Sequence, residues 1–204
     1  MSYLINYYVD VKGLDETVAI KLKKACKMEK SGVRAVFLKD SEVREAYHQL
    51  AKNGEHINVF MKLEIFSGIR GKHAYEMLRN YDEDQLIRIP EKGIARYLIV
   101  EYSKGNKQGF FAYFPIEFAD ELRKFEEFEY RDFIENSRYN RVNSNSIRKW
   151  HYNKMIDCGF DASIADFIQG RAPQSVGAMH YLASARQADK AYSKAVGEIR
   201  WFLE

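Results

Sequence analysis

Residues 85–114 read QLIRIPEKGIARYLIVEYSKGNKQGFFAYF, and this stretch decides the fold class. Apolar residues recur at helical spacing before it. Inside it, three short runs are rich in β-branched and aromatic residues and are separated by turn formers. We expect three strands, over residues 85–89, 97–102 and 110–114. Residues 103–109 would join the last two as a hairpin tip. The chain is therefore predicted to be an α+β protein, mainly helical, with a small antiparallel three-stranded sheet.

Helical patterns surround this stretch on both sides. Asp40 and Ser41 stand where a helix N-cap belongs, with Gly54 near the stop. Apolar spacing and capping residues predict further helices over these segments: 56–66, the residues after Arg70, 116–129, 131–139, 145–158, 161–169 and a helix that carries Tyr181, with Pro173 near its start. The chain ends in an apolar stripe at helical spacing: Ala188, Ala191, Tyr192, Ala195, Ile199 and Phe202.

The first 35 residues differ from the rest of the chain. Residues 3–9 form an apolar stub that is too short to bury itself, and residues 12–35 are rich in lysine with two glycine breaks. We therefore expect residues 1–35 to be the end of a preceding domain with a linker. Residues 36–204 would form one domain.

The composition is that of an ordinary globular protein. Of the 204 residues, 30% are charged and 46% are hydrophobic, and the formal net charge of +3 permits a nucleic-acid surface without requiring one. No apolar run approaches the roughly 20 residues that span a bilayer, and the N-terminus has no secretory pattern. Cys26 and Cys158 form no CxxC pair. Neither a disulfide framework nor a zinc site is indicated, and we expect a reducing, intracellular location.

Two segments in the first half place cations in turns. Ser67-Gly68-Ile69-Arg70 interrupts an apolar helix, so Gly68 permits the close approach of a ligand and Arg70 can act as a bidentate phosphate donor. The alternative is a helix C-cap followed by a surface arginine. Lys104 lies in the expected hairpin tip. A lysine there is usually solvated, but it can also give a proton to a departing alkoxide.

Three residues in the second half complete this set. Arg148 lies near the start of a helix, where backbone N–H groups also favour an anion, although a solvated first-turn arginine fits as well. Arg171 follows Gly170 in a short turn, and Tyr181 alone would be a core aromatic. A tyrosine hydroxyl, with a pKa of about 10, is a poor nucleophile unless fixed cations neutralise the group that it attacks. Together these residues are the parts needed to break a phosphodiester without a metal.

In combination, these segments resemble the catalytic domain of the tyrosine recombinases, the phage-integrase family. They are most similar to the integrases of archaeal viruses and plasmids. The resemblance covers about residues 36–192. Ser67-Gly68-Ile69-Arg70 resembles the box that supplies the first catalytic arginine, and Lys104 matches the hairpin lysine better than Lys107 does. Asn145-Ser146-Ile147-Arg148 resembles the His-x-x-Arg box, which supplies the second arginine.

The remaining matches come with three departures. Gly170-Arg171 is similar to the family's Gly-His box, and Tyr181 matches the nucleophile. Asn145 stands where most members have His, Arg171 where most have His or Trp, and His73 where an acidic residue usually follows the first arginine. Asn145 cannot act as an acid or a base, but it could donate a hydrogen bond to a phosphate oxygen.

The resemblance implies site-specific DNA recombination, by which a viral or plasmid element is integrated or excised. Tyr181 would attack the scissile phosphate and form a 3′-phosphotyrosyl link, while Lys104 would protonate the leaving 5′-oxygen. The other site residues would stabilise or orient the phosphate: Arg70, Asn145, Arg148 and Arg171. A type IB topoisomerase, which relaxes DNA with the same catalytic plan, is the alternative within enzymes. A non-catalytic DNA-binding accessory protein with this fold is the other.

The same resemblance implies partners and domains. The substrate would be a double-stranded DNA attachment site, contacted by Lys72, Lys107 and Lys149, on which the protein would assemble as a tetramer. No cofactor, metal or membrane is implied, and the location would be cytoplasmic, on the nucleoid of a prokaryotic host. Residues 1–35 would end a missing N-terminal DNA-binding domain, and residues 36–204 would be the tyrosine recombinase catalytic domain with its C-terminal helix. The C-terminal stripe would pack either in its own core or on a neighbouring protomer.

Overall fold

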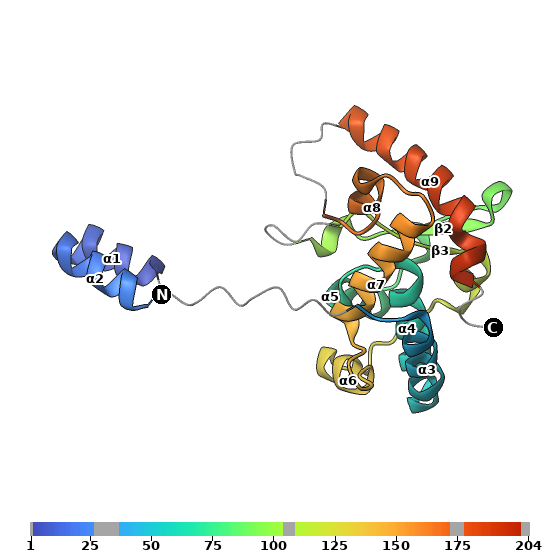
Figure 1. The fold of residues 1–204 in the computed structure, drawn as a ribbon, viewed down its shortest axis with the longest axis horizontal. Coiled ribbons are helices and arrows are strands. Elements are labelled where there is room, and N and C mark those ends of the chain that lie inside the picture. Colours follow the sequence, from blue (N-terminus) through green and yellow to red (C-terminus); the bar gives the residue numbers. More distant parts are fainter. Residues whose placement is uncertain (1, 27–36, 104–108, 172–177, 201–204) are drawn as a thin grey trace. The chain divides into compact units, whose positions relative to one another are not determined.

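Figure 1 shows a computed structural model of the chain. The structure describes residues 2–26, 37–103, 109–171 and 178–200, with side chains from Ala183 onward in the last segment. The chain divides into two compact units, Met1–Ala35 and Val36–Glu204. None of the described helices is both long enough and apolar enough to cross a membrane.

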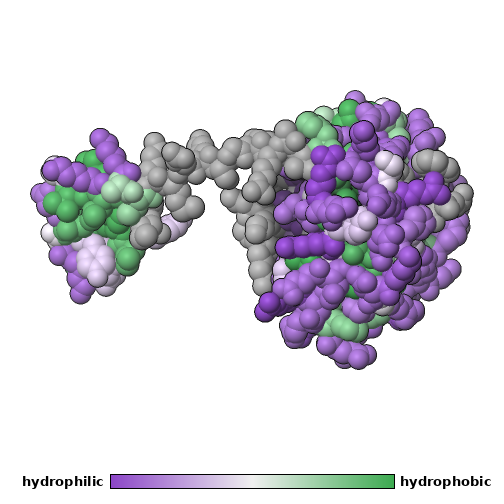
Figure 2. Space-filling model, turned by 60° about the horizontal axis from the view of Figure 1, so that its bottom comes forward, coloured by the Kyte–Doolittle hydropathy of each residue, from purple (hydrophilic) through white to green (hydrophobic). Residues whose placement is uncertain are grey.

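The smaller unit is a pair of helices, α1 (Ser2–Lys12) and α2 (Glu16–Ala25). Gly13 turns the chain between them at a φ of +67°, and Asp15 caps α2 by accepting two backbone N–H groups of its first turn. The apolar stub expected over residues 3–9 is therefore the body of α1. Apolar side chains of both helices lie on the surface (Figure 2): Tyr3, Leu4, Tyr7, Tyr8, Val11, Val18, Ile20 and Leu22.

Helix α4 (Glu55–Ser67) is the central helix of the larger unit, with buried residues on all of its faces. It packs against α3 (Asp40–Leu50), and α5 (Gly71–Arg79) follows after a short turn. All three helices lie where apolar spacing predicts them. The cap of α3 is one residue earlier than expected, because the backbone N–H of Lys39 donates to the Glu42 side chain at 2.8 Å.

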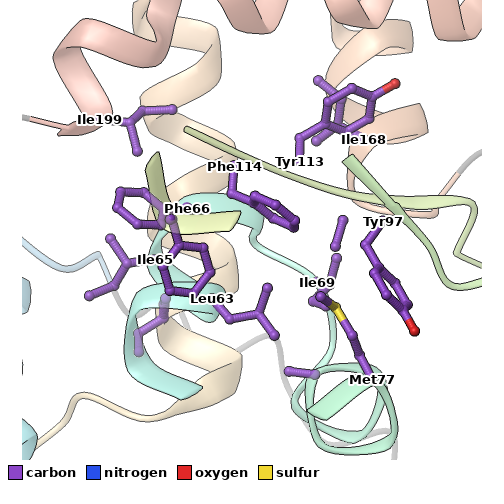
Figure 3. Packing of buried hydrophobic residues seen from close by; sticks show 14 of the residues in the cluster. Leu63, Ile65, Phe66, Ile69, Met77, Tyr97, Tyr113, Phe114, Ile168 and Ile199 are labelled. Carbon is purple, nitrogen blue, oxygen red and sulfur yellow. The ribbon is translucent and has the colours of Figure 1, made fainter. Parts of the chain in front are cut away.

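Three short strands form one antiparallel sheet in the order β1–β2–β3. They are β1 (Leu86–Ile89), β2 (Ile94–Leu98) and β3 (Phe111–Pro115). All of β3 is buried, and Figure 3 shows Phe114 of this strand close to Phe66 of α4. The prediction of a mainly helical α+β fold with a small antiparallel sheet is thus confirmed.

The predicted position of the middle strand is wrong. Gly93, at a φ of +64°, closes a tight turn after β1, so pairing in β2 begins at Ile94 and not at residue 97. Residues Val100–Tyr102 form a 3₁₀ turn instead of continuing the strand. The side chain of Val100 is 43% exposed there. An apolar run of strand-like residues can therefore leave the sheet.

The predicted helix over residues 116–129 is also wrong. A 3₁₀ helix covers Ile116–Glu121, and an irregular segment follows up to α6 (Tyr130–Asn136). Within this segment Phe125 is buried, and its backbone N–H donates to the carbonyl of Leu78 at 2.9 Å. This hydrogen bond to α5 replaces the local bond that a helix would supply to the Phe125 N–H. Tertiary contacts therefore override the helical pattern of this segment. Helix α6 also ends before the expected residue 139.

The two helices after α6 begin and end close to their predicted bounds. Helix α7 (Ser144–Asp157) ends just before Gly159, which adopts a φ of +82°, and α8 (Ala162–Ile168) begins after Asp161. The last helix, α9 (Ala178–Arg200), lies over α8, β2 and β3 (Figure 1).

Helix α9 is docked on its own domain. Among its side chains described from Ala183 onward, the buried ones are Ala185, Ala188, Asp189, Tyr192, Ala195, Val196 and Ile199. Arg96 of β2 donates from Nη1 to Asp189 Oδ1 at 2.6 Å, and both side chains are largely buried. The predicted stripe therefore packs in the domain's own core from Ala188 to Ile199, and Phe202 lies outside the described residues. This docking does not favour packing of that stretch on a neighbouring protomer.

Candidate functional site

A glycine turn after α4 places Arg70 between two helices. Gly68 ends α4 in the left-handed region at a φ of +58°, and its backbone N–H donates to the carbonyl of Glu64 at 2.9 Å. A Cβ atom at Gly68 would lie 2.3 Å from Nδ1 of His151, so both the conformation and the space require glycine. Arg70 then takes an extended conformation as the N-cap of α5. Arg70 is only partly buried in this position.

Arg148 is held by backbone carbonyls on both sides of its guanidinium. Its Nη1 donates to the carbonyl of Gly68 at 2.8 Å and its Nη2 to that of Gln169 at 2.6 Å. The residue is only 7% exposed and makes no ion pair with the described residues. Burial, followed by the charges of Arg70 and Arg171, lowers the pKa of Arg148 to about 9. The guanidinium therefore remains charged at neutral pH, and the charge of Asp166 opposes these effects only weakly.

The Gly-Arg turn brings the third arginine close to the other two. Gly170 has a φ of +61°, and its carbonyl accepts from Arg70 Nη1 at 3.1 Å. Arg171 is exposed, and its guanidinium carbon lies 4.8 Å from the centre of the Tyr152 ring. Burial and the charge of Arg171 lower the pKa of Arg70. Each pKa is lowered first by burial and then by repulsion among the cations, and an anion bound between them would relieve that repulsion.

A cavity of about 600 Å³ lies beside Arg70 and Arg148, and Arg171 is not among its lining residues. The first residues of α5 and α7 line it, so backbone N–H groups at two helix N-termini add positive potential to that of Arg70 and Arg148. Its other lining residues are Lys72, His73, Glu76, Glu101, Tyr102, Tyr130, Ile134, Arg138, Asn143 and Asn145. The cavity can accept an anionic group such as a phosphate.

The remaining predicted side chains occupy different places. Asn145 is exposed at the cavity, in the first turn of α7. Lys72 also lines the cavity, but its Nζ pairs with Glu76 at 2.8 Å and lies 4.7 Å from the centre of the Tyr130 ring. Lys149 is half-buried and does not line the cavity, because on a helix it lies about 100° around from Arg148. The structure thus brings Asn145 and Lys72 to the site, but not Lys149.

Three predicted residues are not described at the side-chain level. Lys104 and Lys107 lie outside the described residues, and Tyr181 is described only as part of the backbone of α9. The ends of the loop that contains both lysines are described. Ser103 Oγ accepts from the backbone N–H of Gly109 at 3.0 Å. A Cβ atom at Gly109 would lie 3.0 Å from Nδ1 of His73, so the base of this loop lies against the cavity wall.

The sequence analysis missed a buried polar network behind Arg148. Gln169 Nε2 donates to the carbonyl of Arg148 at 2.8 Å and lies 3.0 Å from His151 Nδ1. Burial lowers the pKa of His151 to about 4, so the ring is neutral at physiological pH. His151 stands one helical turn after Arg148, which is the one signal in the sequence that points to it.

A buried carboxyl group was missed as well. Glu64 is 1% exposed, and burial raises the pKa of its side chain to about 8, so it is largely protonated at neutral pH. A Cβ atom at Gly71 would lie 3.0 Å from Glu64 Oε1 and 2.8 Å from Ser144 Oγ. Gly71 therefore permits the close approach of α4, α5 and α7 beneath the cavity. Among the described residues, no three His, Cys, Asp or Glu side chains group as metal ligands.

Comparison with known proteins assigns the family. The model of the family described as archaeal phage integrase matches residues 35–198, most of the chain, so the chain belongs to that family. A search of curated proteins finds no match. The matched region contains Arg70, Arg148, Arg171 and the cavity, and it also contains Tyr181 and the undescribed lysine loop. Family membership indicates a role in DNA integration and binding to DNA.

Proposed function

We propose that this member of the archaeal phage integrase family cleaves and exchanges DNA strands at a specific site through a covalent 3′-phosphotyrosyl intermediate. The observation that carries the proposal is the convergence of Arg70, Arg148 and Arg171, which come from three separate segments. Three neighbouring guanidinium groups, of which those of Arg70 and Arg148 lie beside the N-termini of α5 and α7, suit a phosphate better than a neutral substrate.

In the proposed reaction, Tyr181 is the nucleophile. Its oxygen bonds to the scissile phosphorus, its hydroxyl proton passes to solvent, and the bond from phosphorus to the 5′-oxygen breaks. Lys104 gives a proton to that oxygen, which leaves as a 5′-hydroxyl. The phosphotyrosyl link conserves the energy of the phosphodiester, so a 5′-hydroxyl of another strand can reverse the steps and complete the exchange.

The arginines supply the electrostatic part of this proposal. Charge on the phosphate oxygens increases as the pentacoordinate state forms, and fixed cations in a buried setting stabilise it strongly. Arg148 is the most buried of the three and makes no ion pair with the described residues, and the charge of Asp166 offsets the repulsion from Arg70 and Arg171 only in part, so the charge of Arg148 stays available to the phosphate. Asn145, exposed at the cavity, would donate a hydrogen bond to a phosphate oxygen.

The docking of α9 bears on how Tyr181 is delivered. The backbone of Tyr181 lies one helical turn before Ala185, the first buried residue described in α9. The Arg96–Asp189 ion pair and the buried Tyr192 fix the helix further along. Tyr181 therefore belongs to a helix that is anchored on its own domain. The assembly on DNA, which we propose to be tetrameric, would act on this anchored helix.

The test is covalent trapping on a nicked duplex that loses its short leaving strand once cleaved. The wild-type protein should give a DNA-linked band on a denaturing gel, and Tyr181→Phe should give none while binding DNA within a few-fold. The matched control is Tyr81→Phe, which removes a hydroxyl bonded to Glu83, away from the cavity. An adduct from Tyr181→Phe would reject this nucleophile.

Two further arms separate the alternatives. Transfer of the cleaved strand to a second duplex supports a recombinase, whereas relaxation of supercoiled DNA without transfer would indicate topoisomerase activity. DNA binding with no adduct under any condition would indicate a non-catalytic accessory protein.

A further inference from the structure

A buried polar network connects the last helix with Arg148. At one end, the hydroxyl of Tyr192 in α9 donates to the carbonyl of Phe66 at 2.8 Å. The same carbonyl lies 2.8 Å from His151 Nε2. The Tyr192 and His151 side chains are fully buried. One backbone oxygen at the end of α4 therefore joins α9 to α7.

At the other end of the network, two hydrogen bonds connect Gln169 with Arg148. Gln169 Nε2 donates to the carbonyl of Arg148 at 2.8 Å, and Arg148 Nη2 donates back to the carbonyl of Gln169 at 2.6 Å. The second hydrogen of the Gln169 amide is directed at His151 Nδ1, 3.0 Å away. Gln169 thereby fixes both the backbone and the guanidinium of the arginine, and His151 fixes Gln169.

The bonds of this network determine its charge. The Phe66 carbonyl can only accept a hydrogen bond, so His151 carries its proton on Nε2, and Nδ1 is the acceptor for the Gln169 amide. Both side chains are therefore neutral. A carboxylate at either position would also order Arg148, but it would cancel the charge that a phosphate needs.

We propose that His151 and Gln169 are positioning residues that fix the Arg148 guanidinium for the phosphate, and that Tyr192 ties the register of α9 to the same network. The inference rests on the proposed function, because it assigns how the active-site arginine and the nucleophile helix are held together. Arginine side chains are long and lose conformational freedom when they act, so a donor that is fixed before the reaction is more effective than one that is not.

The geometry of Gly68 agrees with this assignment. A Cβ atom there would lie 2.3 Å from His151 Nδ1 and 2.6 Å from Gln169 Nε2. The turn that projects Arg70 is therefore packed directly on the network that holds Arg148. Both arginines depend on the same small set of buried groups.

The test is a double-mutant cycle that measures adduct formation at saturating nicked duplex, with DNA affinity measured separately. Gln169→Met keeps the side-chain length but removes both amide donors. It should slow cleavage by about 10-fold or more while DNA affinity changes by less than about 3-fold, since positioning acts on the reaction and not on binding. In an Arg148→Ala background, the same substitution should slow cleavage no further. The matched control is Gln49→Met, at an exposed position of α3, which should leave the rate unchanged.

A second variant keeps the test decisive if Gln169→Met does not fold. Tyr192→Phe removes only the hydroxyl that reaches Phe66, and we expect it to slow cleavage by about 3-fold or more. Tyr47→Phe is its control, because it removes a part-buried hydroxyl that donates to Asn58 at 3.0 Å. A wild-type rate in Tyr192→Phe overturns the inference, and so does a wild-type rate in folded Gln169→Met or equal slowing by Gln169→Met with and without Arg148. A wild-type protein that forms no adduct overturns the proposed function instead.

Discussion

Arg96 and Arg148 are both largely buried, but the first faces a carboxylate and the second faces carbonyl oxygens. Arg96, on the sheet, pairs with Asp189 at 2.6 Å and lies 4.5 Å from the centre of the Phe111 ring. Arg148, between α4 and α8, bonds the carbonyls of Gly68 and Gln169 and is repelled by two other arginines. The ion pair of Arg96 anchors α9 on the sheet, whereas Arg148, which has no ion pair with the described residues, contributes to a site for an anion.

This difference predicts that Arg96 contributes mainly to the stability of the fold and Arg148 mainly to activity. A buried ion pair loses stability when one partner is removed, because the other charge stays buried without compensation. Removing a repelled cation has no such consequence, and its loss should appear in the reaction instead. The two arginines can therefore be tested against each other with the same substitution.

The largest expected effect on stability is that of Arg96→Met. It leaves the carboxylate of Asp189 buried and unpaired, so the free energy of unfolding should fall by about 3 kcal/mol. Chemical denaturation followed by circular dichroism measures this loss. A drop no larger than that of Arg148→Met would contradict the contrast between the two sites.

Arg148→Met should instead remove activity. Loss of one fixed donor to a phosphate typically costs about 10²-fold in rate. Two carbonyls lose a partner but the repulsion with Arg70 and Arg171 disappears, so we expect only about 1 kcal/mol of lost stability. Adduct formation on a nicked duplex and denaturation of the same preparation give both numbers. A variant that cleaves like the wild type would remove Arg148 from the site.

The neutral network behind Arg148 predicts a pH effect. The pKa of His151 is about 4 in the folded protein, below its value of about 6.5 in an unfolded chain. The unfolded state therefore binds the proton more readily between these values, so stability is complete above about pH 6.5 and falls as pH decreases toward 4. We expect His151 to account for a loss of about 2 kcal/mol between about pH 6.5 and pH 5.

A difference measurement isolates this contribution. His151→Gln keeps a donor that can reach Phe66 but does not titrate, and other groups contribute equally to both proteins. The unfolding free energies of the two proteins should converge as pH decreases over this range. Parallel pH profiles would show that His151 is not buried in its neutral form.

The smallest expected effect is that of a chelator. If three guanidinium groups supply the charge that the phosphate needs, EDTA should leave the rate of adduct formation unchanged. The measurement is cleavage of the nicked duplex with EDTA and with added magnesium. A strict magnesium requirement in the cleavage step would contradict the proposal that arginines supply this charge.

Much of the fold follows from local pattern, and its failures have physical causes. Helix α4 and helix α7 were predictable because their apolar residues recur at helical spacing between clear ends. The segment around Phe125 was not, because a hydrogen bond to Leu78 on another helix decides its conformation. The β2 strand was misplaced because Gly93, and not the apolar run after it, sets the register.

The candidate site divides in the same way. Arg70, Arg148 and Arg171 stand in short motifs, so their convergence could be expected from sequence. Gln169 and His151 were not recognised, because a single glutamine after a helix resembles any polar residue and the spacing of His151 from Arg148 is a weak signal. The ring of His151 is bonded to the carbonyl of Phe66, 85 residues away in the chain, and no local pattern encodes such a contact.

The most direct test of the central claim is to identify the residue that carries the DNA. The wild-type protein is trapped on a nicked duplex, digested with trypsin and nuclease, and the modified peptide is sequenced by mass spectrometry. We predict a nucleotide on Tyr181, attached through a 3′-phosphate. A nucleotide on another residue, or no covalent adduct when the protein is bound to its attachment site, would contradict the claim that the arginine cluster serves phosphotyrosyl transfer.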